Sequence, residues 1–172
     1  MTGVQTCALP ISANLLVQLS TWVLPKNVAV IHVNAGLHDL KTLHYDTREN
    51  VIPLKHYRDN VEVLLRTMRQ RTKAHIIWAT TTLVNDEGSQ KAREKNREFR
   101  RYDADVQAYN RAAVKVCRKL GVPVNDLSAL SRQHADTQLP DGVHFTAEGY
   151  RILGAQVAAL IRSLLEIKKA AP

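Results

Sequence analysis

Short β-branched runs alternate with helical patterns along this 172-residue chain, and this alternation constrains the fold more than any other feature. The run Val28–Val33 is almost continuously apolar, which is typical of a strand covered on both faces in a parallel sheet. Similar runs occupy His75–Thr80 and Val122–Asp126, and each of them follows a helical pattern. The order strand, helix, strand, helix, strand, helix predicts an α/β layer sandwich with a parallel sheet.

Four stretches repeat apolar residues at helical spacing, and the turn chemistry around them marks their ends. Pro25 ends the first stretch, residues 13–23, and Gly121 is the C-cap of the third, residues 106–120. The second covers residues 54–72, and Thr146 caps the start of the fourth. The polar segment 81–101 is too long for a plain connection, and we predict that it forms a flap or lid.

The composition is that of an ordinary globular domain with a basic surface. The formal net charge is +8, and most of the Lys and Arg residues sit in helical patterns beside acids, which indicates solvated helix faces. Aromatic residues make up only 5%, so few rings are available to stack on nucleic-acid bases. No apolar run is long enough to span a bilayer. The two cysteines, Cys7 and Cys117, form neither a disulfide framework nor a metal knuckle.

Polar residues follow the predicted strands at positions where a ligand would bind. Asn34–Asp39 and Thr80–Thr82 come directly after two of the strands, and Asp141–His144 precede the last helix. Ligands of open parallel sheets bind beyond the carboxyl ends of the strands. We therefore expect these three segments to converge on one edge of the sheet.

Asp141 and His144 are the strongest candidates for chemistry. A neutral histidine is well suited to removing a hydroxyl proton near neutral pH, and an acceptor on its other ring nitrogen holds the required tautomer. An aspartate three residues earlier supplies that acceptor if the turn folds back. A bare D-x-x-H pattern favours the structural alternative, an Asx turn at Asp141 and Gly142 with a half-buried histidine, because such pairs are common by chance, so the context decides between the two interpretations.

That context is L-P-D-G-V-H-F-T-A-E-G-Y, residues 139–150, followed by an apolar helix. It resembles the C-terminal catalytic block of the SGNH/GDSL hydrolases. The stretch G-L-H-D, residues 36–39, resembles the G-x-N-D block of the same family, with His38 in place of the asparagine. The resemblance covers roughly residues 13–165 and is closest to the carbohydrate-acetylesterase-like branch.

The resemblance implies a flavodoxin-like three-layer α/β/α fold and a serine ester hydrolase acting on O-acetyl or short acyl esters, with an acylated carbohydrate as its partner. It implies His144 as the general base, Asp141 as the residue that orients it, and His38, Asn34 and Gly36 as the oxyanion and substrate-binding group. A loop histidine hydrogen-bonded to the backbone is an equal alternative for His38. We expect no metal, no cofactor and no contact with nucleic acid or membrane, and the sequence leaves localisation and oligomeric state open.

The start of the chain departs from this pattern. Residues 1–12 contain no charged residue and no periodicity, and we expect a non-native leader there, followed by a single domain over residues 13–172. No G-D-S block occurs, so we expect the first strands and the nucleophile to be missing and the fragment to be inactive; Ser12 is a poor candidate for the nucleophile. The alternative is a non-enzymatic basic module that binds nucleic acid or a protein partner through Lys91–Arg101.

Overall fold

The computed structural model describes residues 11–170, with side chains to residue 166, and contains a parallel sheet in the order β1-β2-β3. The strands are β1 (Val30–Val33), β2 (His75–Ala79) and β3 (Val124–Asn125). Val30 pairs with His75, and Trp78 pairs with Val124 at the far end of β2. All three strands run in the same direction, so their carboxyl ends share one edge, as the alternating pattern predicts.

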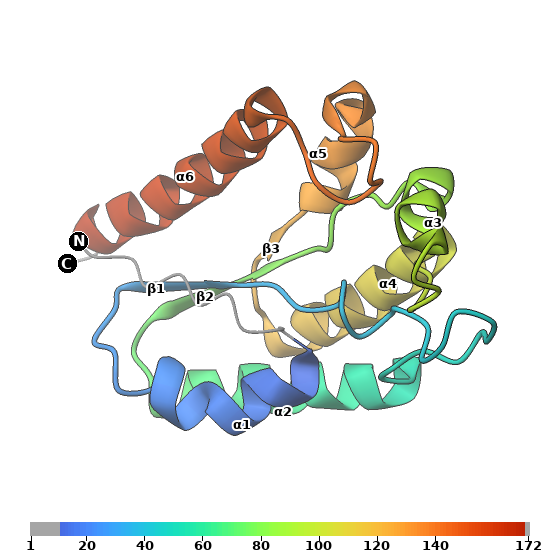
Figure 1. The fold of residues 1–172 in the computed structure, drawn as a ribbon. Helices are drawn as coiled ribbons and strands as arrows, with labels where there is room; N and C mark the ends of the chain where they lie inside the picture. The colour runs from blue at the N-terminus through green and yellow to red at the C-terminus, as the bar shows by residue number, and fades with distance from the viewer. Residues whose placement is uncertain (1–10, 171–172) are drawn as a thin grey trace.

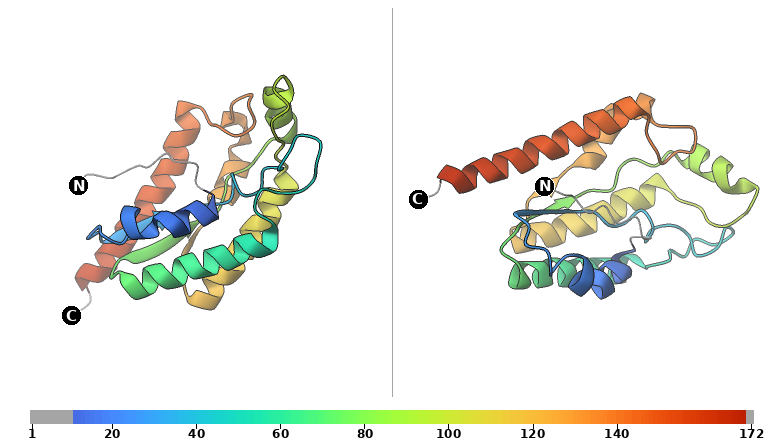
Figure 2. Two further views of the ribbon diagram at one scale, coloured as in Figure 1. Left: turned by 60° about the horizontal axis from the view of Figure 1, so that its bottom comes forward. Right: turned by 60° about the vertical axis from the view of Figure 1, so that its left-hand side comes forward.

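Helices cover both sides of this sheet (Figure 1). On one side lie α1 (Ser12–Trp22), α2 (Leu54–Arg71) and α4 (Asp103–Leu120); on the other lie α5 (Leu127–Gln133) and α6 (Ala147–Ala170). The turned views show α1 alongside α2, which packs on α4 as well (Figure 2). The α/β sandwich expected from the sequence is therefore confirmed.

The core lies between β2 and the helices α2 and α4. Trp78 of the strand is fully buried, and the rings of Tyr57 and Tyr109 meet below the sheet with centroids 4.8 Å apart. The stripe of apolar residues that predicted helix 54–72 is the buried face of α2. Gly121 ends α4 in the left-handed conformation, with φ +62°, as a C-cap glycine should.

The segment between β2 and α4 is not a free flap, in contrast to our prediction. It contains a short helix, α3 (Asp86–Glu94), and its two ends are hydrogen-bonded to other loops. At one end the N–H of Asn85 donates to the carbonyl of Gly142 (2.9 Å), and at the other Thr42 and Arg100 exchange two hydrogen bonds. The segment therefore connects the loop after β1 to the loop before α6.

The predicted leader falls mostly on residues 1–10, which lie outside the described part of the chain. Ser12 is the first residue of α1 and is fully buried. Among the helices that the structure describes, none is both long and apolar enough to cross a membrane.

Candidate active site

Asp141 and His144 form a hydrogen-bonded pair in the loop before α6. Oδ2 of Asp141 lies 2.5 Å from Nδ1 of His144, and Oδ1 accepts the backbone N–H groups of Val143 (3.0 Å) and His144 (2.9 Å). The Asx turn of the structural interpretation is present, and it folds the carboxylate back onto the ring, but His144 is not the packed histidine of that interpretation. The His144 side chain is 62% exposed, and its Nε2 has no hydrogen-bond partner among residues 11–166. A substrate or nucleophile can reach that nitrogen.

The environment keeps the Asp141 carboxyl ionised. Partial burial acts to raise its pKa, but the hydrogen bonds from the His144 ring and from the two backbone N–H groups outweigh burial and lower the pKa to about 2. An ionised carboxylate on Nδ1 fixes the tautomer that leaves Nε2 free to accept a proton.

This lowered pKa predicts how stability depends on acidity. A carboxyl with a folded-state pKa of about 2, against 3.8 ordinarily, stabilises the fold fully above the ordinary pKa and loses that contribution as pH falls toward the folded value. In urea denaturation over that acid range, we expect the free energy of unfolding to fall more steeply for the wild type than for Asp141→Asn. Parallel curves for the two proteins would show that the pair contributes nothing to stability.

Neighbouring backbone holds the Asp141–His144 loop in place. Leu139 N–H donates to the carbonyl of His144 (2.8 Å), which closes the loop on itself. The side chain of Gln138 donates to the carbonyls of Leu83 (2.9 Å) and Gly142 (3.0 Å), which fastens the loop to the segment that carries α3. These hydrogen bonds hold the Asp141–His144 turn both to its own loop and to the segment that carries α3.

The loop after β1 follows a tightly packed path around Gly36. This residue has φ +145°, and a Cβ there would lie 2.6 Å from the hydroxyl of Thr81, so only glycine fits. Tyr57 donates its hydroxyl hydrogen to the carbonyl of Ala35 (2.8 Å). Asn34 donates its side-chain amide to the carbonyl of Ala79 (2.7 Å) and the hydroxyl of Thr81 (3.4 Å), which joins the ends of β1 and β2.

His38 extends from this loop as a half-buried side chain. Burial is the largest cause that lowers its pKa, and the positive charges of Arg101, Lys41 and Arg93 lower it further. Its ring has no hydrogen-bond partner among the described residues, so it does not make the backbone contact that was the alternative to an oxyanion role. A neutral imidazole with a free N–H can donate a hydrogen bond.

Arg101 interacts with both loops, although the sequence marked it only as the end of the basic stretch Lys91–Arg101. Its side chain is buried, and its Nε donates to the carbonyl of Leu37 (2.9 Å) beside His38. Its guanidinium also interacts electrostatically with both His38 and Asp141. The structure therefore brings the two loops into electrostatic range through this arginine. A run of charged residues ordinarily indicates solvent exposure. The only sequence signal for a buried arginine here is the pair of aromatic residues that flank it in F-R-R-Y.

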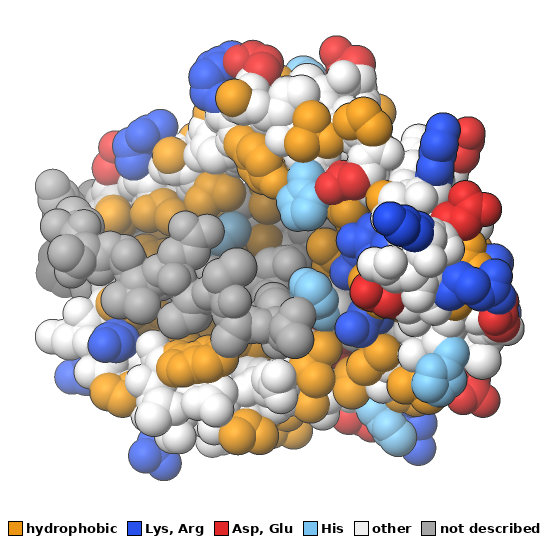
Figure 3. Space-filling view, viewed as in Figure 1, with side chains coloured by type: hydrophobic (Ala, Val, Ile, Leu, Met, Phe, Trp, Pro, Cys, Tyr) orange, Lys and Arg blue, Asp and Glu red, His pale blue; other side chains and the backbone are white. Residues whose placement is uncertain are grey.

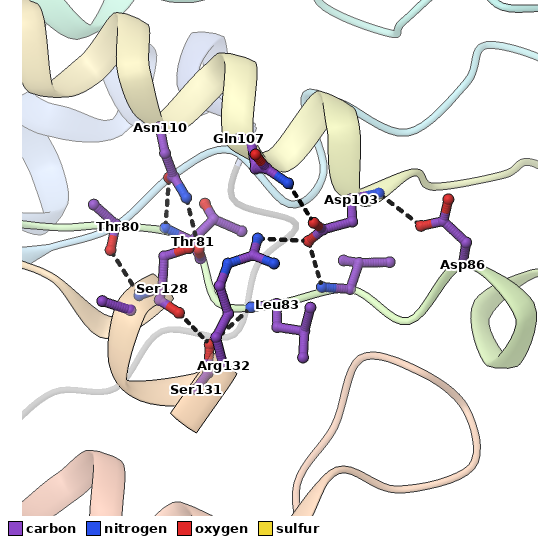
Figure 4. Close-up of polar contacts among 12 residues, drawn as sticks. Thr80, Thr81, Leu83, Asp86, Asp103, Gln107, Asn110, Ser128, Ser131 and Arg132 are labelled. Atoms are coloured by element: carbon purple, nitrogen blue, oxygen red, sulfur yellow. Dashed lines mark hydrogen bonds and ion pairs between the residues drawn. The ribbon is translucent and has the colours of Figure 1, made fainter. Parts of the chain in front are cut away.

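Thr80 and Thr81 form hydrogen bonds that hold the end of β2 against neighbouring helices (Figure 4). The hydroxyl of Thr80 donates to the Asp126 carboxylate (2.9 Å) and accepts the backbone N–H of Ser128 (2.8 Å). Asn110 of α4 accepts the N–H of Thr81 and donates to its carbonyl, both at 2.8 Å. These bonds join β2 to α4 and α5.

A groove away from the Asp141–His144 pair also runs along the surface of the described chain. It measures about 690 Å³ and lies between α4 and α5, lined by residues such as Asn110, Arg111 and Ser128. None of its lining residues belongs to the loop after β1 or the loop before α6. We place the candidate site by its chemistry and not by this groove.

All six serines of the chain lie in the described residues, and none of them is hydrogen-bonded to His144. Ser12 is fully buried; its hydroxyl donates to Asp39 (2.5 Å) and accepts the amide of Asn60 (3.0 Å). The others are Ser20, Ser89, Ser128, Ser131 and Ser163. No described serine is therefore poised as a nucleophile beside the pair.

No group of three or more His, Cys, Asp or Glu side chains among the described residues could hold a metal ion. The carboxylate of Asp39, next to His38, accepts the backbone N–H and the hydroxyl of Ser12.

The arginines in the stretch Lys91–Arg101 mostly contact aromatic rings of their own chain. Arg97 and Arg100 lie over Tyr45, and Arg97 also pairs with Asp46 at 2.5 Å. Rings that stack on these arginines are not open to nucleic-acid bases. No observation favours the nucleic-acid alternative.

Comparisons with known proteins identify the family and support the fold. The family model described as the GDSL-like lipase/acylhydrolase family matches residues 6–152. A lipase/acylhydrolase from Enterococcus faecalis superposes with a TM-score of 0.68 at 20% identity, over 90% of this chain and 71% of that chain. Axe2, an acetylxylan esterase from Geobacillus stearothermophilus, gives 0.65 at 17% identity, over 90% and 68%. The acetyl xylan esterase AlAXEase gives 0.68 at 14% identity, over 88% and 76%. A comparison with curated protein sequences found no match.

Proposed function

Because the chain belongs to the GDSL-like lipase/acylhydrolase family, we propose that it carries the proton-transfer and oxyanion parts of a serine-type ester hydrolase. His144 is the general base, Asp141 orients it, and His38 donates to the oxyanion. The observation that carries the proposal is the 2.5 Å contact between Asp141 and Nδ1 of His144, which leaves Nε2 facing outward.

The proposed chemistry is acyl transfer. In this chain the attacking hydroxyl is that of water: its oxygen bonds to the acyl carbonyl carbon while Nε2 of His144 takes its proton. The bond from that carbon to the alcohol oxygen then breaks, and His144 returns the proton to the leaving alcohol, so that the free acid and the alcohol are released. The carboxylate of Asp141 stabilises the imidazolium that forms in between. Its low pKa of about 2 supports this role, because the carboxylate stays ionised throughout.

His38 is the proposed donor to the oxyanion, with Gly36 shaping the loop that carries it. Burial lowers the pKa of His38 and keeps the ring neutral, and a donor of this kind is typically worth about 10²–10³ in turnover. Asn34 was a second candidate. Its amide already donates to Ala79 and Thr81 at the ends of the strands, which supports His38 over Asn34.

The proposed substrate is an O-acetyl or short acyl ester of a carbohydrate. Its support is that acetylxylan esterases are among the solved structures with this fold, at low identity.

We propose further that this 172-residue chain turns over esters slowly, because none of its six serines is hydrogen-bonded to His144. Purified protein should hydrolyse p-nitrophenyl acetate without a burst and should not be labelled by a fluorophosphonate probe. Without covalent catalysis, a residual acceleration of roughly 10³–10⁴ over water is what a complete site of this type retains. The oxyanion group and binding alone supply part of that residual rate, and His144 adds to it by activating a water molecule, so His144→Ala should slow the reaction without abolishing it.

Two outcomes would contradict these proposals separately. A burst together with a fluorophosphonate-labelled serine would show that the chain has a nucleophile after all. A rate that stays the same in His144→Ala, with Ser20→Ala as a matched control on the exposed face of α1, would remove His144 from the mechanism.

A further inference from the structure

Three cationic side chains surround a single aromatic ring next to the candidate site. Nζ of Lys41 lies 4.8 Å from the centroid of the Phe99 ring, and the guanidinium carbons of Arg93 and Arg101 lie 4.8 Å and 4.7 Å from it. We call these three residues the Phe99 cation cluster. They come from three different segments, which are the loop after β1, helix α3 and the stretch before α4. The fold therefore gathers these charges by tertiary structure and not by sequence proximity.

The acid that acts on the cluster is Asp141, which interacts with Arg101 without forming a salt bridge within the described residues. None of its three members forms an ion pair there, whereas the nearby Arg97 pairs with Asp46 (2.5 Å). Like charges placed together repel, and partial burial strengthens the repulsion. Burial, followed by the charge of Arg93, lowers the pKa of Arg101 to about 10. Contact with one aromatic ring offsets only part of such a cost, since a cation–π contact contributes about 0.5–2 kcal/mol.

The donor groups of the cluster remain available for a ligand. Arg101 uses only Nε, toward Leu37, and Arg93 makes a single long contact of 3.4 Å to the carbonyl of Ser89. Lys41 donates no hydrogen bond within the described residues. No terminal nitrogen of the cluster is among the fully enclosed unpaired atoms of that part of the chain, and Lys41 and Arg93 are only partly buried, whereas Arg101 is largely buried.

The cluster borders the proposed chemistry. All three cations act electrostatically on His38, and Arg101 also acts on Asp141. On one face of the molecule Lys and Arg side chains stand beside histidine side chains (Figure 3). A group held by the cluster would therefore lie next to an ester positioned at His38 and His144.

We propose that Lys41, Arg93 and Arg101 form an anion subsite that binds a carboxylate on the alcohol part of the substrate. The acylated carbohydrate is then an acidic one, which carries a uronic acid close to the ester. Two guanidinium groups offer the planar paired donors that match a carboxylate, and the ammonium of Lys41 adds a point charge. This inference rests on the proposed function for the position of the ester, but binding of the acid itself does not require turnover.

The test is binding of simple sugars to the full chain, followed by NMR or calorimetry. Glucuronate should bind at least tenfold more tightly than glucose, and added salt should weaken only the glucuronate. Hydrogen bonds to charged groups are worth about 1.5–3 kcal/mol, so Arg93→Gln and Lys41→Gln should each weaken glucuronate by about tenfold. These two side chains are only partly buried, so the variants should fold even if Arg101→Gln does not.

The matched control is Arg97→Gln, which removes an arginine of the same stretch that lies over Tyr45 and not over Phe99. It should leave glucuronate binding unchanged. Equal affinities for glucose and glucuronate, or equal losses in Arg97→Gln and Arg93→Gln, would overturn the subsite. Tighter binding of glucose 6-phosphate than of glucuronate would overturn the carboxylate assignment in favour of phosphate. These outcomes are independent of the His144 dependence of p-nitrophenyl acetate hydrolysis, so the two proposals can fail separately.

Discussion

Replacement of Gly142 by alanine is expected to lower the free energy of unfolding by about 2–5 kcal/mol, the sum of a left-handed backbone penalty and overpacking. Gly142 has φ +71°, and a Cβ there would lie 2.4 Å from the carbonyl oxygen of Asn85 and 2.5 Å from the backbone nitrogen of Ser89. Both obstacles are backbone atoms at the start of α3, so no side-chain rotation relieves them. The loop that carries Asp141 would have to separate from α3.

Two other glycines provide matched controls for this prediction. Gly121 has a similar φ of +62°, but nothing lies within 4 Å of an added Cβ, so Gly121→Ala isolates the backbone penalty of about 1–2 kcal/mol. Gly154 lies inside α6 with open space around it, and alanine there should stabilise by up to about 1 kcal/mol. Urea denaturation of the three variants measures the series. Equal losses for Gly142→Ala and Gly121→Ala would show that the packing of α3 on the loop contributes nothing.

The packing of α3 on the loop that carries Asp141 was not predictable from the sequence, although most of the helices and strands were. The helix over residues 54–72 and the cap at Gly121 follow from local patterns, and the structure has both. Helix α3 has almost no apolar residue in D-E-G-S-Q-K-A-R-E, so its periodicity gives no signal. It depends instead on the Asn85 cap, whose side chain accepts the N–H of Gly88 (2.8 Å), and on acids in its first turn and bases in its last.

In the candidate site too, contacts between residues close in sequence were predictable, and contacts between distant residues were not. The contact between Asp141 and His144 depends on a three-residue spacing, so the sequence could suggest it. Arg101 lies 64 positions from Leu37, whose carbonyl it binds, and only the tertiary fold brings the two together. A buried arginine is uncommon enough that a charge pattern predicts exposure at such a position.

The bond between Asp39 and Ser12 is a second long-range contact, and its removal should be about as costly as the Gly142 change. Asp39 is fully buried, and it accepts the Ser12 backbone N–H at 2.9 Å and 3.1 Å and the Ser12 hydroxyl at 2.5 Å. It thereby caps α1 from a distance of 27 residues. Asp39→Ala leaves a buried N–H without a partner, which costs about 1–3 kcal/mol in addition to the loss of a cap worth about 1 kcal/mol.

Ser12→Ala removes the hydroxyl but keeps the N–H bond to Asp39, so it should cost only about 1 kcal/mol. In a double-mutant cycle measured by urea denaturation, the two changes should show a coupling energy of about 0.5–3 kcal/mol. Additive losses would mean that α1 is held by its apolar face alone, against α2, and that the buried carboxylate has no structural partner.

The pH dependence of stability, compared between the wild type and Asp39→Asn, tests the role of the same carboxylate independently. Burial raises the pKa of Asp39, and its bonds to Ser12 oppose that rise only in part. The folded protein therefore binds the proton more tightly than the unfolded chain, and stability falls as pH rises from 3.8 through the folded value. Because asparagine cannot ionise, the wild type should exceed Asp39→Asn in stability by more near pH 3.8 than at neutral pH. A difference that grows toward neutral pH would mean that the Ser12 bonds outweigh burial, and that the ionised carboxylate itself holds α1 against the loop carrying His38.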